Sequence, residues 1–233
     1  MLISGIKKTT LLDFPGKVAT IVFTLGCNFR CHYCHNYEFV LPEKVADFMN
    51  DLIPEVAFFN FLKTRVGFLD GVVITGGEPT IQKDLYEFIV KIKELGFLVK
   101  LDTNGQNPEL LERLIAENLL DYVAMDIKYP FLKYKKIIGV DEDIAKFIKS
   151  KDILLNGNLD YEFRTTISKG YFDEQIIKEI GEDIVGAKRW YLQNLEEKNL
   201  LNAGFDGKSF TPDELNELQV VGAGYVDVCE VRK

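Results

Sequence analysis

The chain has 233 residues, of which 47% are hydrophobic and 27% charged, which is enough for one well-filled core. It contains no apolar run of membrane-spanning length, and its N-terminus lacks the apolar segment and cleavage site of a signal peptide. We therefore expect a cytoplasmic protein with no membrane contact. Its net charge of −8 argues against a nucleic-acid-binding surface, which would need a surplus of lysine and arginine.

Short strands and amphipathic helices alternate along most of the chain. Apolar runs rich in β-branched residues predict six strands, at residues 18–25, 71–75, 97–103, 121–128, 160–167 and 189–195. Helical segments are expected at 42–65 (divided at Pro54), 83–95, 108–118 and 173–185. Helical material is also expected between the end of the fourth strand, at 128, and about residue 156. Strands that are each followed by a helix predict parallel β/α units. Six units predict either a doubly wound sheet or a partial, open barrel.

The two ends of the chain lie outside this alternation. Residues 1–15 are expected to form an extended segment that turns at "FPGK" before the first strand. Thr211 and Glu214 have the spacing of a capping box, which predicts a helix in the tail 196–233, followed by a last strand. No linker, repeat or low-complexity tract divides the chain. We therefore predict one domain over residues 1–233, with its core at about 16–195.

Glycine-rich and polar motifs follow four successive predicted strands: "GCNFRCHYC", "GGEPT", "DTNG" and "MDIK". In parallel β/α proteins the carboxyl ends of the strands meet at one edge, where ligands bind. Four such motifs in register therefore predict a single site.

The loop "CNFRCHYCHN" holds three of the four cysteines, Cys27, Cys31 and Cys34, with the spacing C-x3-C-x2-C. Because a reducing compartment keeps thiols free, this cluster predicts metal binding or redox chemistry rather than disulfides. A structural zinc site would need a fourth ligand, taken from His32, His35 or Cys229. A four-iron cluster held by three thiolates would instead leave one iron open to a small molecule. Cys229 lies in the predicted last strand and is expected to be a small buried side chain.

The cysteine loop, with an aromatic residue before its last cysteine, and the "GGEP" sequence resemble the signature of the radical S-adenosylmethionine (SAM) superfamily. The "DTNG" and "DIK" strand ends and the small size are similar to the glycyl-radical-enzyme activating enzymes. Residues 5–36 most resemble anaerobic ribonucleoside-triphosphate reductase activating proteins. The resemblance covers about residues 3–195 and implies a partial (β/α)6 TIM-like open barrel.

This resemblance implies a cofactor and a reaction. Cys27, Cys31 and Cys34 would bind a [4Fe–4S] cluster, and the fourth iron would bind SAM. Reductive cleavage of SAM would give methionine and a 5′-deoxyadenosyl radical, which removes a hydrogen atom from the substrate. The implied partners are a glycyl-radical enzyme, such as an anaerobic ribonucleotide reductase, and an electron donor such as flavodoxin or ferredoxin. No separate protein acid or base is assigned.

The resemblance also assigns SAM contacts to the glycine-rich motifs. Gly76 and Gly77 would let the backbone approach SAM closely, and Glu78 would pair with its ammonium group. Asp102 and Asn104 suit the ribose hydroxyls, although "TNG" is also ordinary turn chemistry.

Further SAM contacts are expected from the cysteine loop and the later strands: Tyr33 and His35 against the adenine, Asp126 and Lys128 as the D-x-K of the activating enzymes, Arg164 to the SAM carboxylate, and Gln193 to the ribose or adenine. Arg164 is also compatible with a structural ion pair.

His32 and His35 are expected to pack under the cluster or line the adenine, because side chains beside a ligating cysteine usually point away from the metal. Two alternatives remain: a radical SAM enzyme acting on a pterin- or nucleoside-like small molecule, and a non-enzymatic metal or electron-transfer module. A "GGEP" sequence in register with the cysteines favours an enzyme, because a zinc or ferredoxin module does not need it.

Overall fold

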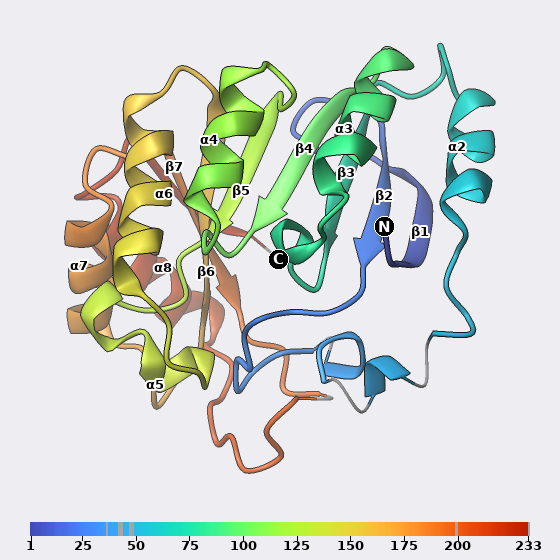
Figure 1. Cartoon of the computed structure of the whole chain (residues 1–233). Coiled ribbons are helices and arrows are strands. Elements are labelled where there is room, and N and C mark those ends of the chain that lie inside the picture. The colour runs from blue at the N-terminus through green and yellow to red at the C-terminus, as the bar shows by residue number, and fades with distance from the viewer. Residues whose placement is uncertain (36, 42–43, 47–48, 199, 233) are drawn as a thin grey trace. The chain divides into compact units, whose positions relative to one another are not determined.

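The structure, a computed structural model, describes residues 1–35, 37–41, 44–46, 49–198 and 200–232. The chain forms two compact units, whose strands and helices are labelled in Figure 1. The first unit comprises Met1–Asn28, Asn36–Thr103 and Asn107–Val123, and the second comprises Phe29–His35, Asn104–Gln106 and Ala124–Lys233. The prediction of a single domain stays a prediction.

Four strands of the first unit pair in chain order: β1 (Ile3–Thr10), β2 (Ala19–Thr24), β3 (Gly71–Gly76) and β4 (Leu98–Thr103). β1 is antiparallel to β2, whereas the β2–β3 and β3–β4 pairs are parallel. Five of the six β2 residues are buried, as expected for a strand covered on both faces. Because Thr24 pairs with Gly76, the segments that follow β2 and β3 leave the sheet side by side.

Helices α2 (Glu55–Lys63), α3 (Leu85–Glu94) and α4 (Pro108–Ala116) belong to this unit, with the short 3-10 helices η1 (Tyr37–Phe39) and η2 (Pro79–Ile81). The buried face of α3 consists of Leu85, Phe88, Ile89 and Ile92, which have the spacing of one helix face. Phe58 of α2 stacks on Phe88, with ring centroids 5.2 Å apart.

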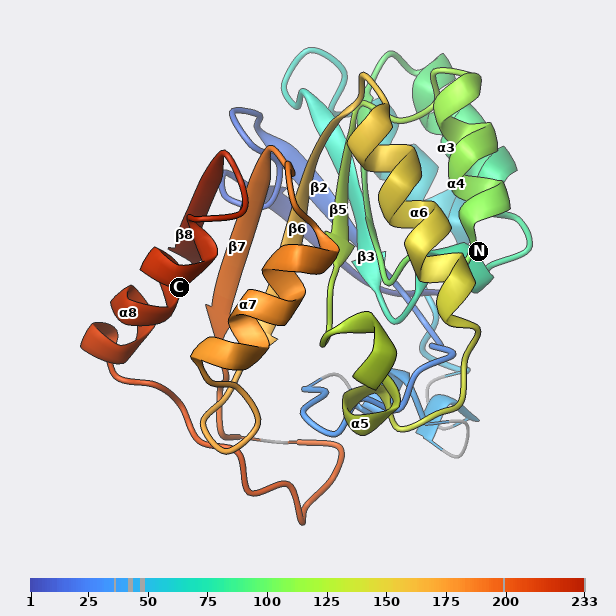
Figure 2. The same cartoon turned by 90° about the vertical axis from the view of Figure 1, so that its left-hand side faces the viewer.

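β5 (Tyr122–Asp126) begins in the first unit, and its last three residues belong to the second. The second unit continues with the parallel strands β6 (Asp160–Ile167), β7 (Arg189–Asn194) and β8 (Val228–Arg232). Its helices are η3 (Phe131–Lys133), α5 (Lys135–Ile138), α6 (Ile144–Asn156), α7 (Glu174–Asp183) and α8 (Pro212–Gly222). Figure 2 shows α7 and α8 beside β7 and β8.

The sheet of the second unit has one apolar and one polar face. Trp190 is fully buried and its indole N–H donates to Thr165 Oγ1 at 2.9 Å. On the other face, the Glu162 carboxylate is fully buried and accepts two hydrogen bonds from Arg232, at 2.6 and 3.1 Å. The guanidinium lies 3.7 Å from the centroid of the Tyr191 ring. A buried charge must be paired in this way to be tolerated.

The predicted fold class is confirmed: the β2–β3, β3–β4, β6–β7 and β7–β8 pairs are parallel, and the edge strands β1 and β8 are not joined. All six predicted strands are present, as are the last strand and the helix with the Thr211–Glu214 capping box. Helix α2 begins directly after Pro54, as expected, but residues 49–53 of the predicted 42–65 helix are not helical, and Ile53 forms a β-bridge with Ile3. Residues 42–43 and 47–48 of the predicted 42–65 helix lie outside the described part.

The N-terminal segment is extended, as expected, and the chain turns at "FPGK". The structure adds that Ile3–Thr10 form β1, which pairs with β2. The pairing satisfies the backbone groups along the free edge of β2, which an unpaired segment would leave exposed.

No helix in the described part of the chain is both long and apolar enough to cross a bilayer.

Candidate active site

The "GGEP" loop is fixed to the start of the cysteine loop within the first unit. The Gly77 N–H donates to the Thr24 carbonyl at 2.9 Å, and the Glu78 N–H donates to the Gly26 carbonyl at 2.8 Å. Gly76 has a φ of 115°, a conformation that favours glycine. A Cβ added to Gly77 would lie 1.9 Å from the Gly26 oxygen. The "GGEP" loop and the loop that carries Cys27 can therefore approach this closely only with glycine at both positions.

Glu78 is buried and its carboxylate holds this loop together. Oε1 accepts hydrogen bonds from the Thr80 N–H at 3.1 Å, the Thr80 hydroxyl at 2.5 Å and the Thr103 hydroxyl at 2.8 Å. The side chain therefore caps η2 and connects it to the end of β4. Pairing with the SAM ammonium group stays a prediction. Thr103 was missed in the sequence because its contact with Glu78 depends on how the strands align.

The predicted residues at the end of β4 have local partners. Asp102 forms an ion pair with the buried Lys100, whose Nζ lies 5.9 Å from the centroid of the Tyr122 ring. In the second unit, Asn104 Oδ1 accepts from the Gln106 N–H at 3.0 Å, which is the turn that "TNG" predicts. Their roles toward the ribose of SAM stay predictions.

Phe29–His35, the part of the cysteine loop in the second unit, is anchored to the end of α5. The Arg30 N–H donates to the Ile138 carbonyl at 2.9 Å, and the His32 N–H donates to the Ile137 carbonyl at 3.2 Å. Within the loop, the Cys34 N–H donates to the Cys31 carbonyl at 3.0 Å. The bonds from Arg30 and His32 use carbonyl groups at the C-terminal end of α5, which have no partner within the helix.

Cys31 is buried and Cys34 is partly exposed, and neither forms a disulfide. Burial raises the pKa of the Cys31 thiol to about 12, although the nearby Lys128 ammonium opposes this shift. The thiol is therefore protonated in the chain without metal. Metal binding would have to displace this proton, because only the thiolate is a ligand.

Asp126, Lys128 and Arg164 form one ion-pair network in the second unit. Asp126 accepts from Lys128 Nζ at 2.9 Å and from Arg164 Nε at 3.1 Å. Burial alone would lower the pKa of Lys128, but the Asp126 carboxylate beside it raises this pKa well above its usual range. Arg164 thus has the structural ion-pair partner that the sequence allowed, and its contact with the SAM carboxylate stays a prediction.

Tyr134 fixes the "DIK" segment and was not identified from the sequence. Its hydroxyl accepts from the Lys128 N–H at 2.9 Å and donates to the Asp126 carbonyl at 3.2 Å. The side chain is fully buried, and burial raises its pKa. The spacing of Asp126, Lys128 and Tyr134 gave no signal for this bridge, because the intervening turn brings the phenol back to the strand end.

The remaining predicted SAM contacts lie in different settings. Tyr33 is buried, and its hydroxyl has no hydrogen-bond partner among the described residues. His35 places Nδ1 3.0 Å from the Lys198 carbonyl oxygen. Gln193 is partly buried in β7, between Thr166 of β6 and Arg232 of β8. These contacts do not test the predicted roles of Tyr33, His35 and Gln193 in binding SAM, which stay predictions.

Cys229 is buried in β8 and packs against α8, since a Cβ added to Gly222 would lie 2.8 Å from its sulfur. Its predicted place as a small buried side chain is confirmed. Burial raises the pKa of this thiol to about 12.

The donor set of the cysteine loop fits an iron–sulfur cluster chemically. It offers three thiols within eight residues, and the buried Tyr33 hydroxyl beside them lacks a partner in the described structure. Cys27 belongs to the first unit, and Cys31 and Cys34 belong to the second. Among the described residues, no three histidine, cysteine, aspartate or glutamate side chains are gathered as a metal site.

Comparison with known proteins identifies the family. The sequence profile of the radical SAM superfamily matches residues 21–181, which include the cysteine loop and the "GGEP" loop. The chain belongs to the radical SAM superfamily. It is therefore an enzyme of the radical SAM type.

Two curated relatives of this radical SAM protein differ in the share of their length that aligns with this chain. A protein of Methanocaldococcus jannaschii named "Putative glycyl-radical enzyme activating enzyme" is 35% identical, and the match covers 99% of this chain and 95% of the relative. A "Probable GTP 3′,8-cyclase" of Pyrococcus horikoshii is 31% identical over 71% of this chain, which spans only 53% of that relative.

Among solved structures, that of Streptococcus suis SuiB bound to S-adenosylmethionine is similar, with a TM-score of 0.66 and 16% identity. The match covers 91% of this chain and 52% of SuiB. At this identity the likeness concerns the fold alone.

Proposed function

We propose that this radical SAM enzyme binds a [4Fe–4S] cluster through Cys27, Cys31 and Cys34 and generates a glycyl radical on a partner enzyme. The observation that carries the proposal is the match to the M. jannaschii protein, which extends over nearly the full length of both chains. An anaerobic ribonucleotide reductase is the proposed partner, because residues 5–36 resemble the proteins that activate that enzyme. Flavodoxin or ferredoxin is the proposed electron donor, and a reducing cytoplasm the proposed location.

Within this proposal, the chain's own residues hold and orient the reactants. When bound, the reduced cluster supplies the electron that cleaves SAM to methionine and a 5′-deoxyadenosyl radical. The three thiols lose their protons and become the cluster ligands. The Gly76–Gly77 backbone lets SAM approach the loop that Glu78 supports, and the cations Lys128 and Arg164 are oriented by Asp126. Tyr33 and His35 lie beside the ligating cysteines and are assigned to the adenine.

The cluster ligands are tested by single substitutions. Cys27→Ala, Cys31→Ala and Cys34→Ala should each abolish SAM cleavage by dithionite-reduced protein, because three thiolates are needed to hold the cluster. The matched control is Cys229→Ala, which removes a buried thiol outside the motif and should retain cleavage. The measurements are iron content and 5′-deoxyadenosine production. Loss of the cluster in folded Cys229→Ala protein would instead indicate a site with four cysteines.

The substrate is tested with the proposed partner. Anaerobic incubation of reduced protein, SAM and an anaerobic ribonucleotide reductase should give an organic radical doublet on the reductase, with about one 5′-deoxyadenosine per radical. A glycine suits this reaction because no side chain shields its α-hydrogen. A reductase whose radical-site glycine is replaced by alanine is the matched control.

A small-molecule substrate is the second candidate, and it is favoured by the match to a protein named GTP 3′,8-cyclase. The same incubation with GTP in place of the reductase tests it. Deoxyadenosine that accumulates only with the nucleotide, with no protein radical, would reject the activating-enzyme proposal.

The zinc alternative predicts a colourless protein with stoichiometric zinc after anaerobic purification.

A further inference from the structure

A segment after β7 lies against the cysteine loop in the second unit. We call Lys198 and residues 200–205 the strap. The Leu201 N–H donates to the Cys34 carbonyl at 2.9 Å, and the Asn202 N–H donates to the His32 carbonyl at 3.1 Å. The cysteine loop is thus held by the strap on its carbonyl groups and by the end of α5 on its N–H groups.

The Asn202 side chain is oriented by the strap itself. Its Oδ1 accepts from the Gly204 N–H at 2.9 Å, so the amide nitrogen is the end that lies 3.3 Å from His32 Nδ1. An amide nitrogen can only donate. His32 Nδ1 must therefore be the acceptor, and the proton of the neutral ring lies on Nε2.

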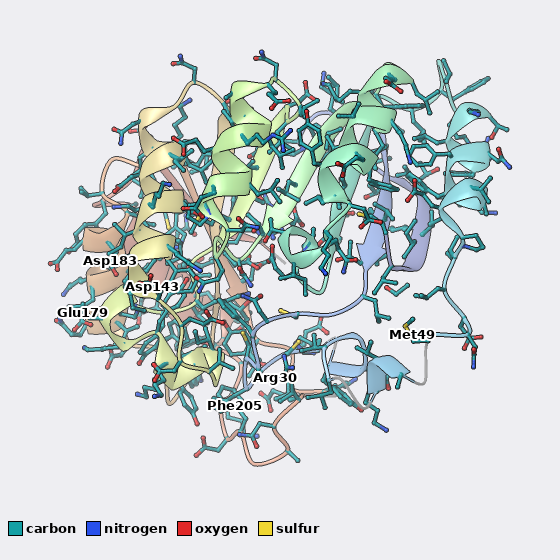
Figure 3. All side chains as sticks on the ribbon, in the orientation of Figure 1. Arg30, Met49, Asp143, Glu179, Asp183 and Phe205 are labelled. Atoms are coloured by element: carbon teal, nitrogen blue, oxygen red, sulfur yellow. The ribbon has the colours of Figure 1, made fainter. Side chains whose placement is uncertain are left out.

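The ring of His32 is also packed. Phe205, labelled in Figure 3, is buried and stacks on it with ring centroids 6.4 Å apart and an interplanar angle of 17°. Phe205 in turn contacts Tyr33 at 6.1 Å and stacks on Tyr171 at 4.4 Å. The imidazole therefore has both a fixed orientation and a fixed tautomer.

His35 has the opposite arrangement. Its Nδ1 lies 3.0 Å from the Lys198 carbonyl oxygen, which can only accept. Its Nδ1 therefore carries the proton, and in the neutral ring Nε2 keeps its lone pair. The strap thus assigns opposite tautomers to the two histidines of the chain.

We propose that Asn202 is a positioning residue that keeps His32 from becoming a ligand of the metal centre. A histidine binds metal through an unprotonated ring nitrogen. In His32, the Nδ1 lone pair accepts from the Asn202 amide and Nε2 carries the proton, so the ring has no lone pair left for a metal. The loop then supplies thiolates without this imidazole, and the open coordination position is left to SAM. The inference rests on the proposed function, since it assigns that position to SAM.

The tautomers can be read directly by 15N NMR of untagged, 15N-histidine-labelled, full-length protein before cluster reconstitution. Only two imidazoles contribute, and His35→Gln assigns them. His32 should show protonated Nε2 and His35 protonated Nδ1. Protonated Nδ1 on His32 in the wild-type protein would overturn the inference.

Asn202→Asp tests the role of the amide. A carboxylate only accepts, so the ring should move its proton to Nδ1 and free Nε2, while the strap backbone and the bond to Gly204 can persist. In reconstituted protein, SAM should bind more weakly, because Nε2 can now compete for the open position. Asn216→Asp makes the same chemical change at an exposed site in α8 and should not alter SAM affinity.

A double substitution separates positioning from general damage to the fold. If Asn202 acts through His32, Asn202→Asp combined with His32→Gln should bind SAM as tightly as His32→Gln alone. An additional loss in the double variant, or an unchanged His32 tautomer in Asn202→Asp, would overturn the inference. If Asn202→Asp does not fold, Asn202→Ser, which can both donate and accept, takes its place and should give a mixture of the two tautomers. Failure of the wild-type protein to bind SAM at all would reject the proposed function, while the NMR result would still decide the tautomers.

Discussion

Gly77 lies so close to the Gly26 carbonyl oxygen that a side chain at this position requires the two loops to separate. This contact joins the cysteine loop and the "GGEP" loop in the first unit, so the smallest added side chain should disturb both. The sequence identifies the glycines by their motif, but the reason for Gly77 is visible only in the distance.

We expect Gly77→Ala to lower the free energy of unfolding by about 1–3 kcal/mol, the usual cost of overpacking, and to weaken SAM binding. The control is Gly5→Ala in β1, where an added Cβ would meet Phe23 at an ordinary 3.6 Å. That variant should stay within about 0.5 kcal/mol of the wild-type protein. Urea denaturation and titration calorimetry with SAM measure the two effects. Equal stability of the two variants would contradict the argument.

Glu78 is a second residue whose role is defined by its contacts. Glu78→Ala should lower the free energy of unfolding by about 1–3 kcal/mol, because it removes the acceptor of Thr80 and Thr103 in a buried setting. Glu78→Gln keeps one acceptor oxygen and should lose less. Urea denaturation checks this order.

The same pair of variants separates the structural role of Glu78 from a contact with SAM. If the carboxylate pairs with the SAM ammonium group, Glu78→Gln should weaken SAM binding more than its stability loss explains, because a charge-assisted bond is lost. Wild-type affinity in Glu78→Gln would show that the carboxylate serves the loop alone.

At the scale of single elements, α8 illustrates how a sequence pattern becomes a stable helix start. Thr211 and Glu214 form the predicted capping box, and Lys169 Nζ lies 2.7 Å from the same Glu214 carboxylate. The hydrogen bond from Lys169, with those from Thr211, lowers the pKa of Glu214 from 4.5 to about 2.

This shift predicts a dependence of stability on pH. A carboxyl group with a lowered pKa stabilises the folded protein above its unfolded pKa and loses that contribution as the pH falls through its folded pKa. The stability difference between wild type and Glu214→Gln should therefore be full above about pH 5 and shrink between pH 4.5 and about 2. Urea denaturation at several pH values measures it. A difference that grows on acidification would have the wrong sign.

For the elements, the sequence was informative wherever a pattern is local. The boundaries of β6 were predicted to the residue, and the capping box located α8 within the tail. The pairing of β1 was missed because its residues "ISGIKKTT" contain glycine and two charges, which weaken the strand pattern. The partner strand, not the local sequence, makes this segment regular.

For the whole molecule, the motifs identified the family and the candidate ligands, but not what surrounds them. The Tyr134 bridge to Lys128, the Thr103 contact to Glu78 and the strap all depend on segments that only folding brings together. Arg164 could be named from the sequence, yet its partner Asp126 lies on another strand and could not be assigned before the strands were aligned. Spacing along the chain carries no information about such contacts.

The strap also has a consequence for biosynthesis. His32 and Asn202 are separated by 170 positions in the sequence, so the ribosome completes the cysteine loop long before the strap exists. During most of translation, the His32 and Cys34 carbonyls lack the donors that later hold them. We therefore expect the nascent chain to be a poor acceptor of iron and sulfide, with cluster insertion following release from the ribosome. Chains interrupted before residue 198 should accumulate without iron, even when cells grow without oxygen and with ample iron.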